Sequence, residues 1–132
     1  MGEVLNSIRI SSTGDDMDIK GKITCTTSNI LYIGTCRKGD RSCPDNPQYC
    51  GETGKTAEER FVGHRNTIVQ GCHEHTNLPV GQHFRGAGHS ASDFVFTPVE
   101  RIFSRNVFVR KVRERHMINN LNLISDGLNK KL

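Results

Sequence analysis

The chain lacks any long apolar run. In its 132 residues no apolar stretch approaches the roughly 18 residues that a membrane-spanning helix needs, and the sequence therefore predicts no membrane partner. The opening residues, MGEVLNSIRISSTGDD, also lack a basic segment followed by an apolar one, so we expect no secretory signal. Internal repeats and low-complexity segments are missing as well. These absences favour a single small domain with a modest core.

The number of cysteines is odd, which argues against a disulfide framework. Five are present, namely Cys25, Cys36, Cys43, Cys50 and Cys72. Without a secretory signal, this count indicates a reducing compartment, and we expect an intracellular protein. Reduced cysteines that lie near histidines then become candidate metal ligands.

Positive charge is present in slight excess and is unevenly distributed. The net charge of +4 at pH 7 mildly favours anionic partners. Residues 101–115 hold six basic side chains and one acidic one, Glu114. The basic residues are Arg101, Arg105, Arg110, Lys111, Arg113 and Arg115. Either a solvated helix face or a surface that binds nucleic acid explains this cluster.

Short β-rich runs predict the strands. The run NILYIGTC (29–36) is typical of a buried strand, and QYCGE (48–52) follows after a loop over 37–47. These two runs predict an antiparallel hairpin, and DFVFTPVERIF (93–103) predicts a further strand. For residues 1–27 we expect an extended arm with one hairpin.

Two longer helices are expected, with a short one near Val80–Phe84. Thr56 and Glu59 have the spacing of a capping box, which predicts a helix from there to about Gly71. Its apolar face carries Ala57, Phe61 and Ile68. Arg60 and His64 lie one turn apart at the edge of that face, where the helix meets the sheet.

Glu114 occupies an unusual place in the second long helix. Ser104 is the expected N-cap of this helix, which the pattern extends over 105–122. Wheel angles place Glu114 in the middle of an apolar stripe made by Val107, Ile118 and Leu121. Because a buried unpaired carboxylate is costly, we expect a partner, either a metal ion or a basic side chain in a structural pair.

Together these residues resemble the GIY-YIG nuclease superfamily. The two tyrosine motifs stand as ILY (30–32) and YCG (49–51). The family's functional positions fall on Tyr32, Tyr49, Arg60, His64, Glu114 and Asn129. The resemblance implies an α+β fold over residues 28–132, with about three antiparallel strands flanked by helices and residues 1–27 as an extension.

A narrower resemblance is to the endonuclease domain of Penelope-like retrotransposons. It is carried by ITCTTSNILYIGTC, by QYCGETGKTAEERFVGHR and by PVGQHFRGAGHSASDF. It implies a loop insertion held by structural Zn²⁺, with ligands Cys36, Cys43, His83 and His89. Sulfur and imidazole ligands favour Zn²⁺ over Mg²⁺. Rival ligands are Cys25, Cys72, His73 and His75, and free cysteines beside a surface histidine cluster are the alternative.

The resemblance also implies the chemistry of a phosphodiesterase. Glu114 would hold Mg²⁺ or Mn²⁺, and Arg60 would bind the phosphate. Tyr49, Tyr32 and His64 remain alternatives for the general base. Asn129 would hold the phosphate or Glu114 by hydrogen bonds.

The function implied is that of a metal-dependent DNA endonuclease. It would nick DNA in the nucleus and leave a 3′-hydroxyl that primes reverse transcription. The expected partner is a reverse transcriptase domain of the parent polyprotein. The six basic residues of 101–115 would follow the phosphates. The alternatives are a zinc-stabilised nucleic-acid-binding module with a decayed nuclease site, and a repair or restriction nuclease of the same superfamily.

Overall fold

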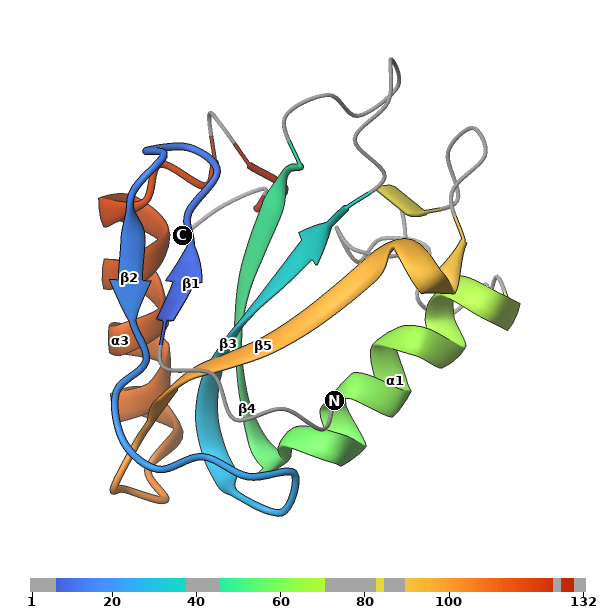
Figure 1. The fold of residues 1–132 in the computed structure, drawn as a ribbon. Helices are drawn as coiled ribbons and strands as arrows, with labels where there is room; N and C mark the ends of the chain where they lie inside the picture. Colours follow the sequence, from blue (N-terminus) through green and yellow to red (C-terminus); the bar gives the residue numbers. More distant parts are fainter. Residues whose placement is uncertain (1–6, 38–45, 71–82, 85–89, 125–126, 130–132) are drawn as a thin grey trace.

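A three-stranded antiparallel sheet forms the centre of the molecule (Figure 1). The computed structural model describes residues 7–37, 46–70, 83–84, 90–124 and 127–129. The strand order is β4-β3-β5, with β3 at Ser28–Cys36, β4 at Gln48–Thr56 and β5 at Phe94–Arg101. Helices α1 (Ala57–Gln70) and α3 (Val107–Asn120) lie on opposite sides of the sheet, and a 3₁₀ turn, η2 (Ala91–Asp93), precedes β5. The predicted α+β class, with about three antiparallel strands flanked by helices, is confirmed.

Strand β3 is central because it is apolar on both faces. Its residues from Ile30 to Ile33 are all buried, as expected for a strand covered on two sides. In the antiparallel register, Tyr32 faces Gly51 on β4 and Pro98 on β5. The prediction of this strand is confirmed, whereas β4 continues beyond the predicted residue 52, to Thr56.

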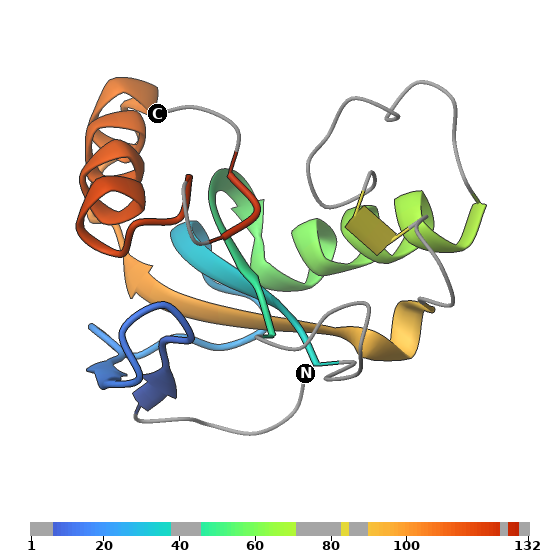
Figure 2. The same cartoon turned by 90° about the horizontal axis from the view of Figure 1, so that it is seen from above.

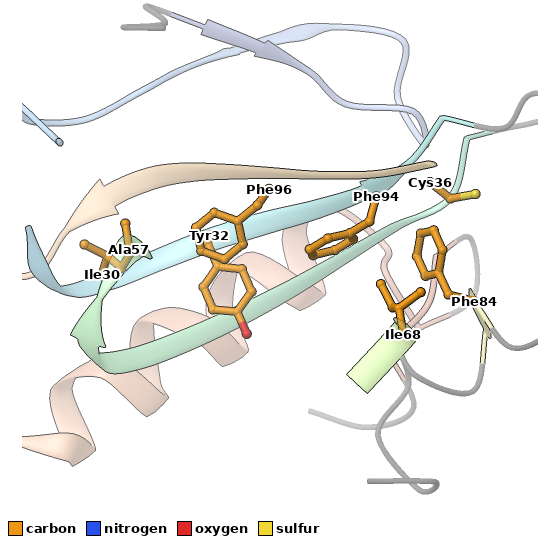
Figure 3. Packing of buried hydrophobic residues seen from close by; sticks show 8 residues of the cluster. All are labelled: Ile30, Tyr32, Cys36, Ala57, Ile68, Phe84, Phe94 and Phe96. Atoms are coloured by element: carbon orange, nitrogen blue, oxygen red, sulfur yellow. The ribbon is translucent and has the colours of Figure 1, made fainter. Parts of the chain in front are cut away.

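The two faces of the sheet carry separate cores. The core on the α1 face, drawn in Figure 3, comprises Ile30, Tyr32, Cys36, Ala57, Ile68, Phe84, Phe94 and Phe96. The core on the α3 face comprises Leu31, Ile33, Cys50, Val99, Ile102, Ile118 and Leu123. The alternation of neighbouring β3 residues between the two sets follows the two-residue period of a strand.

Residues 7–20 pack against the sheet and do not project as the expected extended arm. They contain the predicted hairpin, formed by β1 (Ser7–Arg9) and β2 (Asp16–Asp18). Ile8, Met17 and Ile19 pack against the core on the α3 face. Backbone bonds from Lys20 N to Val99 O, 2.8 Å, and from Arg101 N to Lys20 O, 3.2 Å, fasten the segment that follows to β5.

Helix α1 begins at the predicted capping box. The Glu59 amide donates to Thr56 Oγ1 at 3.2 Å, and the Thr56 amide donates to Glu59 Oε1 at 3.3 Å. These reciprocal bonds satisfy two donors of the first turn. Ala57 and Ile68 are buried and Phe61 packs beside them, so the predicted apolar face is confirmed.

Helix α3 begins later than predicted. Asn106 is its N-cap and accepts a bond from the Phe108 amide at 2.9 Å, while Ser104 Oγ accepts from the Asn106 amide at 3.1 Å. The predicted cap, Ser104, therefore orders the preceding turn. The predicted stripe is wrong at Val107, which is exposed, although Ile118 is buried as expected.

The sequence also predicts a short helix near Val80–Phe84 and no membrane-spanning helix. Of the short helix expected near Val80–Phe84, only His83 and Phe84 lie among the described residues, and both are helical. Within the described ranges, no helix has the length and apolar character needed to cross a membrane.

Candidate active site

The predicted site residues meet beside the edge strand β4. Tyr32 on β3, Tyr49 on β4 and His64 on α1 are mutual neighbours on the α1 face. The two tyrosine rings lie 6.3 Å apart, and the His64 ring lies 5.5 Å from Tyr32 and 6.1 Å from Tyr49. Residues that are 32 positions apart in the chain thus form one cluster.

A chain of hydrogen bonds fixes three of these residues. Arg60 Nε donates to the Tyr32 hydroxyl oxygen at 3.0 Å, and that hydroxyl is hydrogen-bonded to His64 Nε2 at 2.7 Å. Tyr32 and His64 are both buried, whereas Arg60 and Tyr49 are half-buried.

Gly51 makes room for the Tyr32 ring. A β-carbon at position 51 would overlap the ring, with its Cε1 only 2.9 Å away. The Tyr-x-Gly spacing of the second motif therefore has a steric cause, since Gly51 faces Tyr32 in the register. Figure 3 shows the Tyr32 ring beside Phe96, with ring centroids 4.6 Å apart.

Burial holds the aromatic cluster in its neutral form. Desolvation, followed by the Arg60 charge, lowers the pKa of His64 to about 3. Burial also raises the pKa of Tyr32 far above its usual value. For Tyr49, burial and then the negative charge of Glu114 raise the pKa to about 12. All three side chains are therefore uncharged at neutral pH.

Glu114 approaches this cluster from α3. It is half-buried, and burial raises its pKa, while the charges of Lys111 and Arg60 act in the opposite direction. Its own charge raises the pKa of Tyr49 and of Cys50, so it lies within electrostatic reach of β4. The fold thus brings Glu114 to the same edge strand as Arg60.

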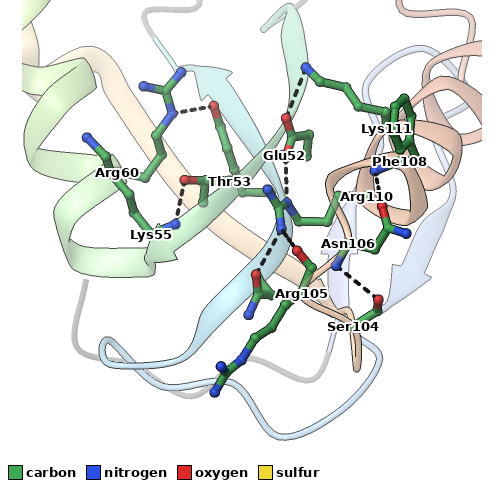
Figure 4. Close-up of polar contacts among 12 residues, drawn as sticks. Glu52, Thr53, Lys55, Arg60, Ser104, Arg105, Asn106, Phe108, Arg110 and Lys111 are labelled. Atoms are coloured by element: carbon green, nitrogen blue, oxygen red, sulfur yellow. Dashed lines mark hydrogen bonds and ion pairs between the residues drawn. The ribbon is translucent and has the colours of Figure 1, made fainter.

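Three of the six basic residues are held by carboxylates that the sequence does not place near them. Figure 4 shows Glu52 on β4 between two of these cations. Glu52 accepts from Arg110 Nε at 2.7 Å and from Lys111 Nζ at 3.0 Å, and Arg113 forms two bonds, 2.9 and 2.8 Å, with Glu100. In space, two carboxylates from outside residues 101–115 thus join the one acid within that segment.

Glu52 is a site residue that sequence reasoning missed. Burial alone would raise its pKa, but hydrogen bonds from Arg110 and Lys111 outweigh burial and lower it. Its only signal in the sequence is an acid directly after the YCG motif, in a strand with buried residues. Of the predicted DNA-binding set, Arg101, Arg105 and Arg115 are exposed and form no ion pair with a described carboxylate, whereas the exposed Lys111 is paired with Glu52.

The Asn129 side chain bonds to the backbone of β4, and its expected contact with the phosphate or with Glu114 stays a prediction. Its Oδ1 accepts from the Cys50 amide at 2.8 Å, and its Nδ2 donates to the Cys50 carbonyl at 3.0 Å. Leu128 N also bonds to Gln48 O at 2.8 Å. Asn129 therefore holds the outer edge of β4, and both ends of its amide are engaged there.

The expected zinc ligands lie only in part within the described residues. Cys36 is buried in the core on the α1 face, and the His83 ring lies 5.1 Å from that of Phe84. Cys43 and His89 lie outside the described residues, as do Cys72, His73 and His75, and Cys25 is half-buried. Over the described part of the chain, no three His, Cys, Asp or Glu side chains form a metal-binding group. The Cys₂His₂ site stays a prediction.

Comparison with protein-family models, with curated proteins and with solved structures finds no match for this chain.

Proposed function

We propose that this protein is a divalent-metal-dependent DNA endonuclease that hydrolyses one phosphodiester bond. The observation that carries the proposal is the Arg60–Tyr32–His64 hydrogen-bond chain, which lies beside Tyr49 and within electrostatic reach of Glu114. Such a set joins a phosphate-binding cation, a candidate base and a carboxylate at one strand edge. A 3′-hydroxyl product that primes reverse transcription, and structural Zn²⁺, belong to the same proposal.

Arg60 is suited to bind the scissile phosphate. Its Nε is occupied by Tyr32, which fixes the plane of the guanidinium. With the described residues, the Nη groups form no hydrogen bond. They are therefore available to two phosphate oxygens, and a guanidinium that is already oriented stabilises developing charge without reorganisation.

Tyr49 is the best candidate for the general base, and it would act as the phenolate. Burial raises the pKa of Tyr49, but the Arg60 charge lowers it toward that form, and a bound cation would lower it further. Tyr32 is fully buried, and its hydroxyl already bonds to both Arg60 and His64. His64 is buried as well, and its Nε2 is occupied by Tyr32. Tyr49 alone among the three is partly accessible, so a water molecule can reach it. Tyr32 and His64 then act by positioning Arg60.

Glu114 fits the role of a ligand for Mg²⁺ or Mn²⁺. It is a half-buried carboxylate, and its raised pKa reports that burial disfavours its charge. Hard cations of this kind prefer oxygen ligands and keep several waters, so one carboxylate is sufficient. When bound, the cation would stabilise phosphoryl charge and offset the Glu114 charge that raises the pKa of Tyr49.

The test is nicking of supercoiled plasmid in Mg²⁺ or Mn²⁺. We expect Glu114→Gln to lower the nicking rate by about 100-fold or more, since it removes the charge that holds the cation. Glu58→Gln, at an exposed position in the first turn of α1, is the matched control and should nick normally. Equal nicking by the wild type and Glu114→Gln would refute the assignment. Binding without nicking by the wild type would favour the decayed binding module.

A further inference from the structure

Exposed apolar side chains are concentrated in one stretch of the chain, at the turn before α3 and in its first half. Five of the seven large apolar residues that are exposed in the described part of the chain lie between residues 103 and 112. Phe103 is 82% exposed, Phe108 74% and Val112 64%. Phenylalanine rings this exposed make no contribution to a core, so a cluster of them indicates a contact surface.

The local structure presents these side chains in a fixed arrangement. Phe108 and Val112 lie one turn apart on α3, and Arg115 follows on the same side at about 100° per residue. The Arg101 guanidinium lies over the Phe103 ring, 4.9 Å from its centroid. Figure 4 shows Phe108 at the start of α3, where its amide is bonded to the Asn106 cap.

Three exposed basic residues of this stretch, Arg101, Arg105 and Arg115, form no ion pair with a described carboxylate. Glu52 and Glu100 are bonded instead to Arg110 and Arg113. We call the six residues Arg101, Phe103, Arg105, Phe108, Val112 and Arg115 the Phe103–Phe108 surface. Its charge complements a polyanion, and its exposed rings offer stacking platforms.

We propose that the Phe103–Phe108 surface binds unpaired bases of the DNA substrate. Phe103 and Phe108 would stack on bases, which is a recurring mode of single-strand recognition, and the three arginines would neutralise the adjoining phosphates. Glu114 lies six residues after Phe108 on the same helix, about 9 Å farther along its axis. The inference rests on the proposed function for its ligand, DNA, and adds a preference for single-stranded or locally opened DNA over matched duplex.

The experiment is fluorescence anisotropy of the full chain with a labelled oligothymidine and with a matched duplex of equal length. Divalent-free buffer prevents cleavage during the titration. We expect the double variant Phe103→Ala/Phe108→Ala to weaken single-strand binding by about 10-fold or more, with an unchanged dependence on salt. Val62→Ala, an exposed apolar position on α1, is the control and should bind normally.

A charge variant separates stacking from electrostatics. Arg105→Gln should weaken binding to both oligonucleotides alike and reduce the salt slope by about one. Because all the substituted side chains are exposed, thermal unfolding should remain unchanged and serves as the check on folding.

Specific outcomes would overturn the inference. It fails if the double phenylalanine variant binds oligothymidine as the control does. It also fails if that variant loses only self-association in sedimentation, or only binding to phosphatidylserine vesicles. If the wild-type protein never nicks DNA but its DNA binding depends on the two phenylalanines, this inference holds and the proposed endonuclease activity is refuted. If the protein nicks DNA normally but its DNA binding does not depend on the two phenylalanines, the endonuclease proposal holds and this inference is refuted.

Discussion

The two faces of the central sheet bury polar groups of different kinds. On the α1 face, Tyr32 and His64 are neutral and joined by a hydrogen bond within an aromatic core. On the α3 face, Glu52 and Arg110 are charged and joined as an ion pair. A neutral hydrogen bond avoids the desolvation cost of charge, whereas a buried ion pair carries that cost and depends on both partners.

The two faces therefore supply different kinds of chemical group. The α1 face supplies groups whose protonation states stay fixed near neutral pH. The α3 face supplies charge, including the carboxylate of Glu114. Edge strand β4 takes part in both, since Tyr49 lies on the α1 side and Glu52 pairs with α3. Salt and pH should therefore disturb the two faces differently.

The largest expected effect concerns the ion pair on the α3 face. Arg110→Ala should lower the free energy of unfolding by about 3 kcal/mol, because Glu52 would lose its main partner while 10% exposed. Lys111→Ala removes a 56% exposed partner of the same carboxylate and should cost less than about 1 kcal/mol. Urea denaturation of both variants checks this. Equal costs would mean that Glu52 has no preferred partner.

A smaller effect is expected on the α1 face, from His64. Its pKa is about 3 in the folded protein and 6.5 in the unfolded chain, so below pH 6.5 only the unfolded state gains this proton. Stability should therefore fall as pH falls from 6.5 toward 3, by about 2 kcal/mol between pH 6 and 4.5.

The variant His64→Gln isolates this contribution, since glutamine does not titrate. Subtracting its unfolding curve from that of the wild type, measured across the same pH range, removes the contribution of the carboxyl groups. A difference that stays constant with pH would show that His64 takes up its proton in the folded state as well.

The smallest effect should have the opposite sign. Because burial raises the pKa of Glu114, its charged form destabilises the folded protein at neutral pH, and protonation relieves this as pH falls through the folded pKa. In divalent-free buffer at pH 7, Glu114→Gln should raise the free energy of unfolding by less than about 1 kcal/mol. The gain should shrink at pH 4. A loss of stability at pH 7 would instead mean that the charge has a stabilising partner.

Local patterns predicted the elements of the α1 face well. The β-rich run at 29–36 and the Thr56–Glu59 capping box involve neighbours in sequence, and both occur as expected. The one-turn spacing of Arg60 and His64 also placed them correctly where α1 meets the sheet. Such features depend on a few adjacent residues, which a sequence displays directly.

The α3 face was harder to predict because its contacts join distant positions. Glu52 and Arg110 are 58 residues apart, and Cys50 and Asn129 are 79 apart. A cluster of six cations with one acid in sequence therefore proved to contain two further carboxylates in space. Val107 was misjudged for a related reason, because periodicity alone does not show which side of a helix meets the sheet.

The Asn129 side chain also bears on how the molecules behave at high concentration. The outer edge of β4 presents main-chain donors and acceptors that another chain's strand would match, and such edges promote aggregation. The described residues 127–129 lie beside β4 (Figure 2). Asn129 occupies the amide and the carbonyl of Cys50, and Leu128 occupies the carbonyl of Gln48. The C-terminal residues thus act as a cover that blocks strand addition on the side of the sheet where the candidate active site lies.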